Sequence, residues 1–275
     1  MTWELLASGY GLIEGPTVAG DGTLVFSDVL DGGVYRLGSD GLVETVIPKR
    51  RGVGGIAEHA DGGFVVGGRD LQHVRNGTTR VVLTLDGALG FNDFGTDAAG
   101  RIYVGSVRYR SLDPTAKPIP GEMWRVDLDG SATMLYGEVQ QCNGVAISPD
   151  GSTLYHADTR AGCVLMHDLI DDGASVRNPH HWPLGKRSQP DGIAIDVTGA
   201  VWVADHGAGR VVRFRPDGTL DSVLDVPGRH VTSVCFDGAD LIVVTASNDA
   251  EPARRGSIFR TTTTTSGAPV HLARI

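Results

Sequence analysis

The sequence predicts an all-β fold, namely a six-bladed β-propeller with four antiparallel strands in each blade. One short phrase occurs six times along the 275 residues, at intervals of 38 to 51 residues. Turn residues follow each copy, and then comes a short run in which apolar and polar residues alternate, as in strands. Four short strands repeated about every 40–50 residues are typical of propeller blades. Six copies therefore predict six blades.

The repeated phrase is expected to form the inner strand of each blade, where the blades converge. Glycine and other small residues in the phrase suit this crowded axis. Stacking the blades buries both faces of each sheet, and closing the ring removes the exposed ends. The six copies are Glu14–Val18, Gly54–Ala57, Asn92–Gly95, Asn143–Ile147, Asp191–Ile195 and Thr232–Phe236.

The alternating runs after each phrase are expected to form the next strands outward. The predicted second strands are Thr23–Asp28, Gly63–Gly68, Ile102–Ser106, Thr153–Asp158, Val201–Asp205 and Leu241–Thr245. The predicted third strands are Gly33–Leu37, Gly121–Val126, Gly162–His167, Gly209–Arg215 and Gly256–Thr261. The even spacing argues against two sandwich domains, the alternative for a chain of this length. We expect residues 1–275 to form a single domain.

The ring needs one more outer strand to close. Two segments could supply it: Trp3–Ala7 near the N-terminus or Val270–Ile275 near the C-terminus. A strand from the N-terminus would latch the ring and leave no open edge. The sequence leaves both possibilities open.

Composition limits the possible partners and locations. The net charge is −9 and there is no cluster of Lys or Arg, which argues against nucleic acid. No apolar run is long enough to span a bilayer, and no basic-then-apolar leader precedes Glu14, so we expect a cytoplasmic monomer or weak homo-oligomer without membrane contact. The three cysteines, Cys142, Cys163 and Cys235, lack metal-site spacing and are expected to be buried thiols.

The first position of the phrase varies, and four of its six occupants are oxygen donors: Glu14, Asn92, Asn143 and Asp191. Equivalent positions of a propeller form a ring at one end of the central tunnel. Two carboxylates and two amide oxygens suit a hard divalent cation, whose charge the carboxylates balance. Asn or Asp before Gly also occurs in ordinary turns. Four donors in register, one of them a Glu without turn preference, favour a cation site.

Several motifs, in this order and spacing, resemble the senescence marker protein, gluconolactonase and luciferin-regenerating enzyme family. They are Glu14-Gly15-Pro16, Asn92-Asp93, Cys142 to Gly151, Pro190 to Ala194, Gly209 to Phe214 and Thr232-Ser233-Val234. The resemblance covers nearly the whole chain. It implies a six-bladed propeller that hydrolyses lactones or related esters with one divalent cation in the tunnel mouth.

The resemblance also implies roles for the ring residues. Glu14, Asn143 and Asp191 would hold the cation, and Asn92 would lie beside it and touch substrate or bound water. A divalent cation polarises the lactone carbonyl and lowers the pKa of a bound water. Asp191 would take the proton of that water as general base, while Glu14 would be a purely structural ligand. All-oxygen ligation favours Ca²⁺, with Mg²⁺, Mn²⁺, Fe²⁺ or Zn²⁺ as alternatives.

The chain departs from the sugar-lactone hydrolases of this family in the third repeat. Gly90 stands where those enzymes have an Arg that binds sugar hydroxyls, and Arg108 and Arg110 stand where acidic character is expected. Unpaired hydroxyls are poorly tolerated in such a site. We therefore expect a substrate less polar than an aldonolactone, against a mouth that carries Phe91, Tyr109 and Trp182.

Other side chains are expected near the mouth, because second strands end where inner strands begin. Arg108, Tyr109 and His206 are the candidates for substrate binding, with Asn92. The proline-rich segment Tyr109–Pro120 is expected to project there as a lid or as an idle insertion. The fold alone leaves another class open, a non-catalytic propeller that binds a ligand or calcium in a regulatory role.

Overall fold

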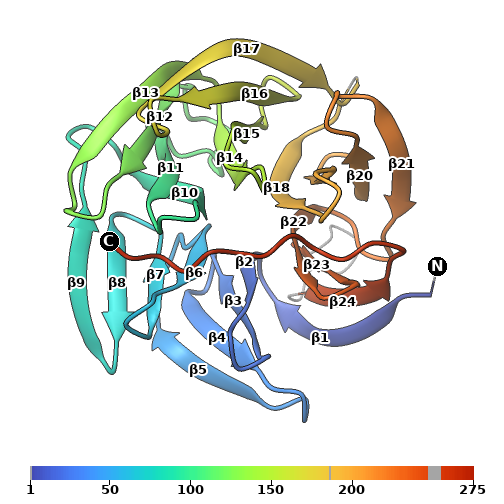
Figure 1. Cartoon of the computed structure of the whole chain (residues 1–275). Coiled ribbons are helices and arrows are strands. Elements are labelled where there is room, and N and C mark those ends of the chain that lie inside the picture. The colour runs from blue at the N-terminus through green and yellow to red at the C-terminus, as the bar shows by residue number, and fades with distance from the viewer. Residues whose placement is uncertain (1, 186, 247–254) are drawn as a thin grey trace.

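The computed structural model describes residues 2–185, 187–246 and 255–275. Six four-stranded antiparallel sheets surround a central axis (Figure 1), which confirms the predicted six-bladed propeller. The described part of the chain contains no helix that is long and apolar enough to cross a membrane.

The first five blades run outward from the axis in sequence order, and the sixth takes its outer strand from the N-terminus. The inner strands are β2 (Ile13–Val18), β6 (Ile56–Glu58), β10 (Gly90–Thr96), β14 (Cys142–Ile147), β18 (Pro190–Ile195) and β22 (Val231–Asp237). The second strands are β3 (Leu24–Asp28), β7 (Phe64–Val66), β11 (Ile102–Val107), β15 (Thr153–Asp158), β19 (Val201–Asp205) and β23 (Asp240–Thr245).

The third and fourth strands complete the blades. The third strands are β4 (Gly33–Leu37), β8 (Leu71–Arg75), β12 (Gly121–Val126), β16 (Cys163–Ile170), β20 (Arg210–Phe214) and β24 (Gly256–Thr262). The outer strands are β5 (Val43–Pro48), β9 (Thr78–Leu83), β13 (Ala132–Val139), β17 (Ser175–Pro183), β21 (Leu220–Asp225) and β1 (Glu4–Tyr10).

The N-terminal strand closes the ring. Strand β1 pairs antiparallel with β24, from Glu4 opposite Arg260 to Tyr10 opposite Gly256. An ion pair of 2.6 Å between the Glu4 carboxylate and the Arg260 guanidinium joins the two ends of the chain. Because first and last strands share one sheet, the last blade has no open edge.

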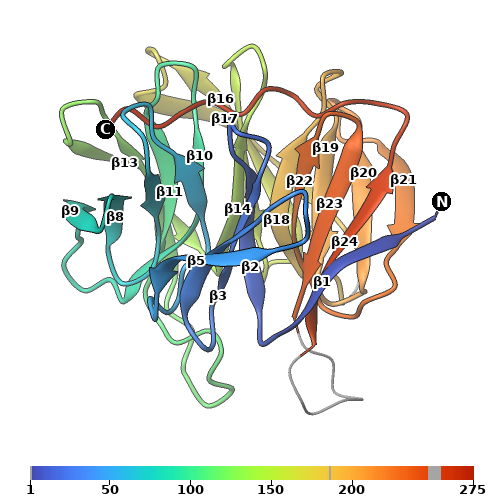
Figure 2. The ribbon, with the colours of Figure 1, turned by 90° about the horizontal axis from the view of Figure 1, so that it is seen from below.

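The C-terminal segment, the other candidate for closure, crosses one face of the propeller instead (Figures 1 and 2). The Ala268 amide donates to the Ile195 carbonyl at 2.8 Å, and the Ala273 amide donates to the Glu58 carbonyl at 2.9 Å. This segment therefore ties the fifth blade to the second across the end of the axis. In Figure 2 the loop of residues 109–120 projects from the opposite face.

The core lies between neighbouring blades. One cluster combines Val25 and Val34 of the first blade with Phe64 and Val66 of the second, and all four are buried. Burial of both faces explains why second strands such as β7 are apolar throughout. The three cysteines are free and buried, as expected.

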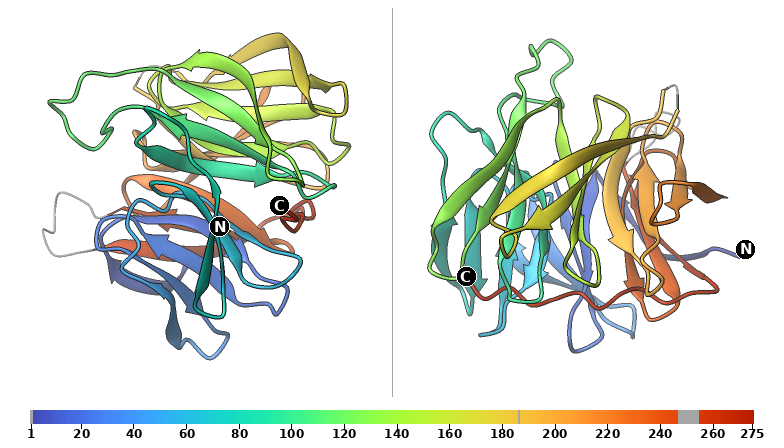
Figure 3. Two further views of the ribbon diagram at one scale, coloured as in Figure 1. Left: turned by 90° about the vertical axis from the view of Figure 1, so that its left-hand side faces the viewer. Right: turned by 45° about the horizontal axis from the view of Figure 1, so that its top comes forward.

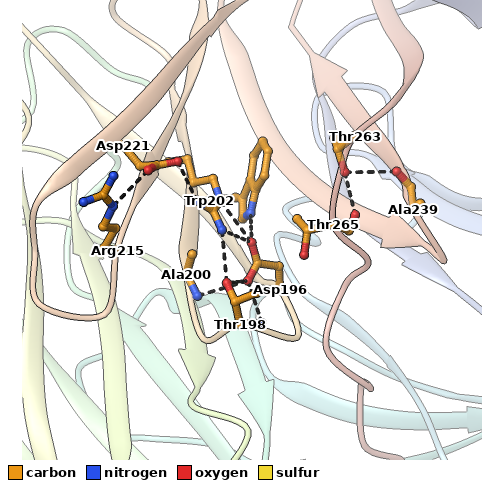
Figure 4. Close-up of polar contacts among 10 residues, drawn as sticks. Asp196, Thr198, Ala200, Trp202, Arg215, Asp221, Ala239, Thr263 and Thr265 are labelled. Carbon is orange, nitrogen blue, oxygen red and sulfur yellow. Dashed lines mark hydrogen bonds and ion pairs between the residues drawn. The ribbon is translucent and has the colours of Figure 1, made fainter.

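A buried aspartate fixes the turn between β18 and β19, next to the C-terminal segment (Figure 4). Asp196 Oδ1 accepts hydrogen bonds from the amides of Thr198 and Ala200, at 2.9 and 3.1 Å. Its Oδ2 accepts from the Trp202 indole at 2.9 Å and from the Arg213 guanidinium at 2.8 Å. With both oxygens used, this carboxylate has a structural role.

Candidate functional site

The ring residues of the inner strands line an open cavity of about 980 Å³ at one end of the tunnel. Pockets that bind small molecules typically have volumes of about 300–1,000 Å³, so this cavity is large enough for such a ligand. The structure brings together all four predicted donors and the threonine of the sixth copy: Glu14, Asn92, Asn143, Asp191 and Thr232. The prediction that the variable position forms a ring at the mouth agrees with this arrangement.

Irregular pairing turns the donors toward the axis. In three blades the inner strand has two residues opposite one residue of the second strand, and the donor is one of the two. These bulges lie between Phe91 and Phe94, between Cys142 and Val145, and between Pro190 and Ile193. A bulge of this kind commonly re-aims a side chain at a functional site. In the first blade the irregularity follows Glu14 directly.

The glycine after each of three donors allows the inner strands to approach closely. A Cβ on Gly144 would lie only 2.6 Å from the Ile193 amide nitrogen and 2.8 Å from the Gly192 carbonyl carbon, and it would collide with the Asp191 carbonyl oxygen. Only glycine therefore fits between β14 and β18. This contact keeps Asn143 and Asp191 at adjacent positions of the ring.

Hydrogen bonds orient the two amide side chains. Asn143 Nδ2 donates to Thr159 Oγ1 at 3.1 Å, and Thr159 Oγ1 donates to the Pro190 carbonyl at 2.7 Å. Asn92 Nδ2 donates to the Cys142 carbonyl at 3.1 Å. Because the NH₂ group of each amide donates to a protein acceptor, the amide oxygen of each remains available to bind a cation or a substrate. Sequence reasoning missed Thr159, whose signal was its place directly after the second strand of its blade.

The two carboxylates of the ring are buried, with 7% of Glu14 and 5% of Asp191 exposed. Burial raises the pKa of the Glu14 carboxyl well above its usual range, and the nearby charges of Asp191 and Asp93 raise it further. Burial and the charge of Asp93 raise the pKa of Asp191 in the same way. A divalent cation between Glu14 and Asp191 would offset both the burial of their charges and the repulsion between them.

Asp93 adds a third carboxylate that sequence reasoning did not single out. Its side chain is half-buried and lines a separate small cavity on the far side of the ring. Loss of surrounding water raises its pKa to about 7, although the Phe94 amide donates a hydrogen bond to it. In its ionised form Asp93 acts on both ring carboxylates and raises their pKa values.

The donor set suits a hard cation. Asp191 Oδ1 is buried and has no hydrogen-bond partner. An unpartnered buried oxygen is costly unless a ligand meets it. Across the described ranges, no three His, Cys, Asp or Glu side chains are grouped as metal ligands. A cation here must therefore combine the carboxylates of Glu14 and Asp191 with amide oxygens, which fits an oxygen-seeking ion.

Three of the four predicted substrate-binding residues line the cavity: Asn92, described above, Tyr109 and His206. The Tyr109 hydroxyl donates to Gln141 Oε1 at 3.1 Å. The His206 ring lies 4.8 Å from that of His230, and burial together with this neighbour lowers the pKa of His206 to about 4. His206 is therefore neutral at physiological pH and can donate or accept one hydrogen bond.

Arg108 points elsewhere. Its guanidinium pairs with the Glu122 carboxylate at 3.0 Å and donates to the Asp86 carbonyl at 2.6 Å. It contributes to a small neighbouring hollow and does not line the main cavity. The carboxylate of Glu122, which follows the lid segment, thus holds the Arg108 guanidinium away from the main cavity.

The expected aromatic mouth is partly wrong. Phe91 and Tyr109 line the cavity, but Trp182 does not. Trp182 lies in the outer strand β17 and packs between the rings of Tyr155 and Phe214, with centroid distances of 5.3 and 5.8 Å. Its large apolar surface is used to join two blades.

The segment predicted as a lid borders the cavity with residues 109–113. Figure 3 shows the loop extending well beyond the sheets on the side opposite the C-terminal segment. Its position favours a lid over an idle insertion.

Comparison with known proteins identifies the family of the chain. The family model described as "SMP-30/Gluconolactonase/LRE-like region" matches residues 12–248. The chain belongs to this family. A 6-deoxy-6-sulfogluconolactonase from Pseudomonas putida is 32% identical over 246 residues, covering 82% of this chain and 79% of that protein. A pentonolactonase from Haloferax volcanii is 29% identical, covering 74% and 71%.

A solved structure shares the fold. The crystal structure of a calcium-binding protein, regucalcin, from Agrobacterium tumefaciens superimposes with a TM-score of 0.87 and 22% identity. The match covers all of this chain and 98% of that one. At this identity the likeness concerns the fold, and the site has to be argued from its own residues.

Proposed function

We propose that this SMP-30/gluconolactonase-like protein is a divalent-metal-dependent hydrolase of lactones or related esters. One observation carries the proposal: four oxygen donors converge in an open cavity, and one of their buried oxygens, Asp191 Oδ1, has no partner. A scaffold protein does not need such a ring. The lactonase relatives support the reaction class.

Glu14, Asn143 and Asp191 would hold the cation. When bound, the cation supplies a Lewis acid that polarises the carbonyl and lowers the pKa of a water at the site. Asp191 takes the proton of the attacking water, because its carboxylate is buried in the cavity at the edge of the proposed cation site. Thr159 holds the amide of Asn143 in place. Asn92 contacts the substrate beside the cation, and Tyr109 and His206 contact it from the wall.

Removal of the cation tests the proposal. Incubation with a chelator should abolish hydrolysis of a panel of lactones and aryl esters, and added Ca²⁺ should restore it. Mg²⁺, Mn²⁺, Fe²⁺ and Zn²⁺ form the comparison series, and oxygen distances of about 2.3–2.6 Å in a loaded crystal would identify calcium as the bound ion. Hydrolysis that persists at full rate after complete removal of metal would contradict metal dependence.

A regulatory calcium-binding propeller is the second candidate, because the solved regucalcin is named as a calcium-binding protein. The same experiment separates the two. Cation binding that raises the melting temperature, together with no hydrolysis of any ester in the panel, would favour the regulatory role.

We also propose that the substrate carries fewer hydroxyl groups than an aldonolactone, because Gly90 replaces a hydroxyl-binding arginine. A simple alkyl lactone or aryl ester should then have a specificity constant equal to or above that of gluconolactone. A tenfold preference for gluconolactone, about 1.4 kcal/mol in the transition state, would show that the Gly90 argument is wrong.

A further inference from the structure

We propose that Arg51 and Arg69 form an anion-binding subsite, so that the lactone or ester substrate carries a carboxylate, phosphate or sulfonate group remote from its carbonyl. This inference rests on the proposed hydrolase function for the scissile bond. The subsite itself rests on the geometry of the second blade.

The two arginines stand side by side on neighbouring loops. Both line the cavity, and both side chains are exposed to it. Gly68, which precedes Arg69, packs against the backbone of Arg51. A Cβ on this glycine would lie 3.2 Å from the Arg51 carbonyl oxygen. Arg51 and Arg69 therefore enter the lining of the cavity from adjacent backbone positions.

Neither guanidinium has a hydrogen-bond or ion-pair partner among the described residues. Some exposed arginines elsewhere on the propeller are paired, for example Arg215 with Asp221 at 2.9 Å and Arg260 with Glu4 at 2.6 Å. A guanidinium is built to bind carboxylate, phosphate or sulfonate oxygens through two parallel hydrogen bonds. The two cavity arginines are thus available for such a group.

Gly90 gives these arginines access to the substrate. The Phe91 amide donates to the Gly68 carbonyl at 2.8 Å, which brings β10 against the loop of the second blade. A Cβ on Gly90 would lie 3.0 Å from the Gly68 carbonyl carbon and 3.1 Å from Arg69 Cα. The backbone of Gly68 and Arg69 therefore leaves no room for a side chain at position 90. The positive charge in this part of the cavity comes from the guanidinium of Arg69 instead.

Besides the two arginines of the second blade, Arg110 and Asp113 of the lid segment bring charge to the rim of the cavity. Glu14 and Asp191 lie on its floor, where a divalent cation balances them. The wall opposite the arginines offers neutral polar groups, those of Gln141, Gln189, Thr159 and His206. In a protein of net charge −9, Arg51 and Arg69 thus form a local positive wall of a concave site. Such walls attract and orient anions.

Binding of two open-chain products tests the subsite without turnover. Calorimetric titration should show that gluconate 6-phosphate binds at least tenfold more tightly than gluconate, and 6-deoxy-6-sulfogluconate provides the sulfonate arm. Arg51→Gln with Arg69→Gln should remove this preference and leave the affinity for gluconate within threefold. Arg75→Gln, an exposed arginine of the same blade that does not line the cavity, is the matched control.

Hydrolysis provides the second measurement. The specificity constant for mono(4-nitrophenyl) glutarate should exceed that for 4-nitrophenyl butyrate, which lacks the terminal carboxylate, and salt should reduce the difference. Equal affinities for both members of the product pair, or a preference that survives the double substitution, would overturn the subsite. Hydrolysis of neither ester with the cation bound would instead count against the proposed function, while the product titration still decides the subsite.

Discussion

Asp191→Asn should lower kcat at least 100-fold while retaining part of the cation affinity. The substitution keeps one oxygen donor at the ring but removes the charge and the proton acceptor. A positioned general base contributes about 10²- to 10⁴-fold to the rate. Steady-state hydrolysis at saturating cation, together with calorimetric titration of the cation, measures the two effects separately.

Glu14→Gln is the matched control for that experiment. It removes the charge of the other buried carboxylate of the ring, whose proposed role is limited to holding the cation. We expect weaker cation binding, with kcat largely recovered when the cation is saturating. If Asp191→Asn kept activity within about threefold of wild type, less than 1 kcal/mol of barrier, Asp191 could not be the base.

The sequence could predict the donor ring because a propeller repeats one geometry. Glu14, Asn92, Asn143 and Asp191 occupy the same position of the same phrase, and every inner strand starts at the same end of the axis. The strand pattern of β15 and β19 was predicted to the residue for the same reason. Local patterns suffice where the repeat itself places each copy.

Contacts between blades could not be predicted in this way. Thr159, which orients Asn143, donates to the Pro190 carbonyl of the next blade, and Trp182 packs against Phe214 of that blade. Gly90 packs against the backbone of Gly68 and Arg69 in the neighbouring blade. These contacts depend on which residues of neighbouring blades meet, and that in turn depends on loops of different length. The alternation of apolar and polar residues within a strand contains no information about such contacts. For the same reason the sequence did not decide whether the N-terminal or the C-terminal segment supplies the last outer strand.

The dependence of the ring on close backbone contact leads to the last prediction. Gly144→Ala should destabilise the protein by about 3 kcal/mol and weaken cation binding at least tenfold, although no ligand atom is removed. The added Cβ meets backbone atoms of Asp191, Gly192 and Ile193, which cannot rotate away as a flexible side chain could. Overpacking of this kind typically costs about 1–3 kcal/mol or more. Relief of the clash requires β14 and β18 to separate, which moves Asn143 away from Asp191.

Gly137→Ala is the control for this substitution. Gly137 also lies in a strand, β13, but a Cβ there would meet only the Glu122 side chain, at an ordinary 3.8 Å. Urea unfolding should therefore show little change for Gly137→Ala and a clear loss for Gly144→Ala, with the cation titration following the same order. A Gly144→Ala protein with wild-type stability and wild-type cation affinity would mean that the ring does not depend on this contact. The donors would then be placed by their own strands alone, and the glycine of the repeated phrase would serve only the local bulge.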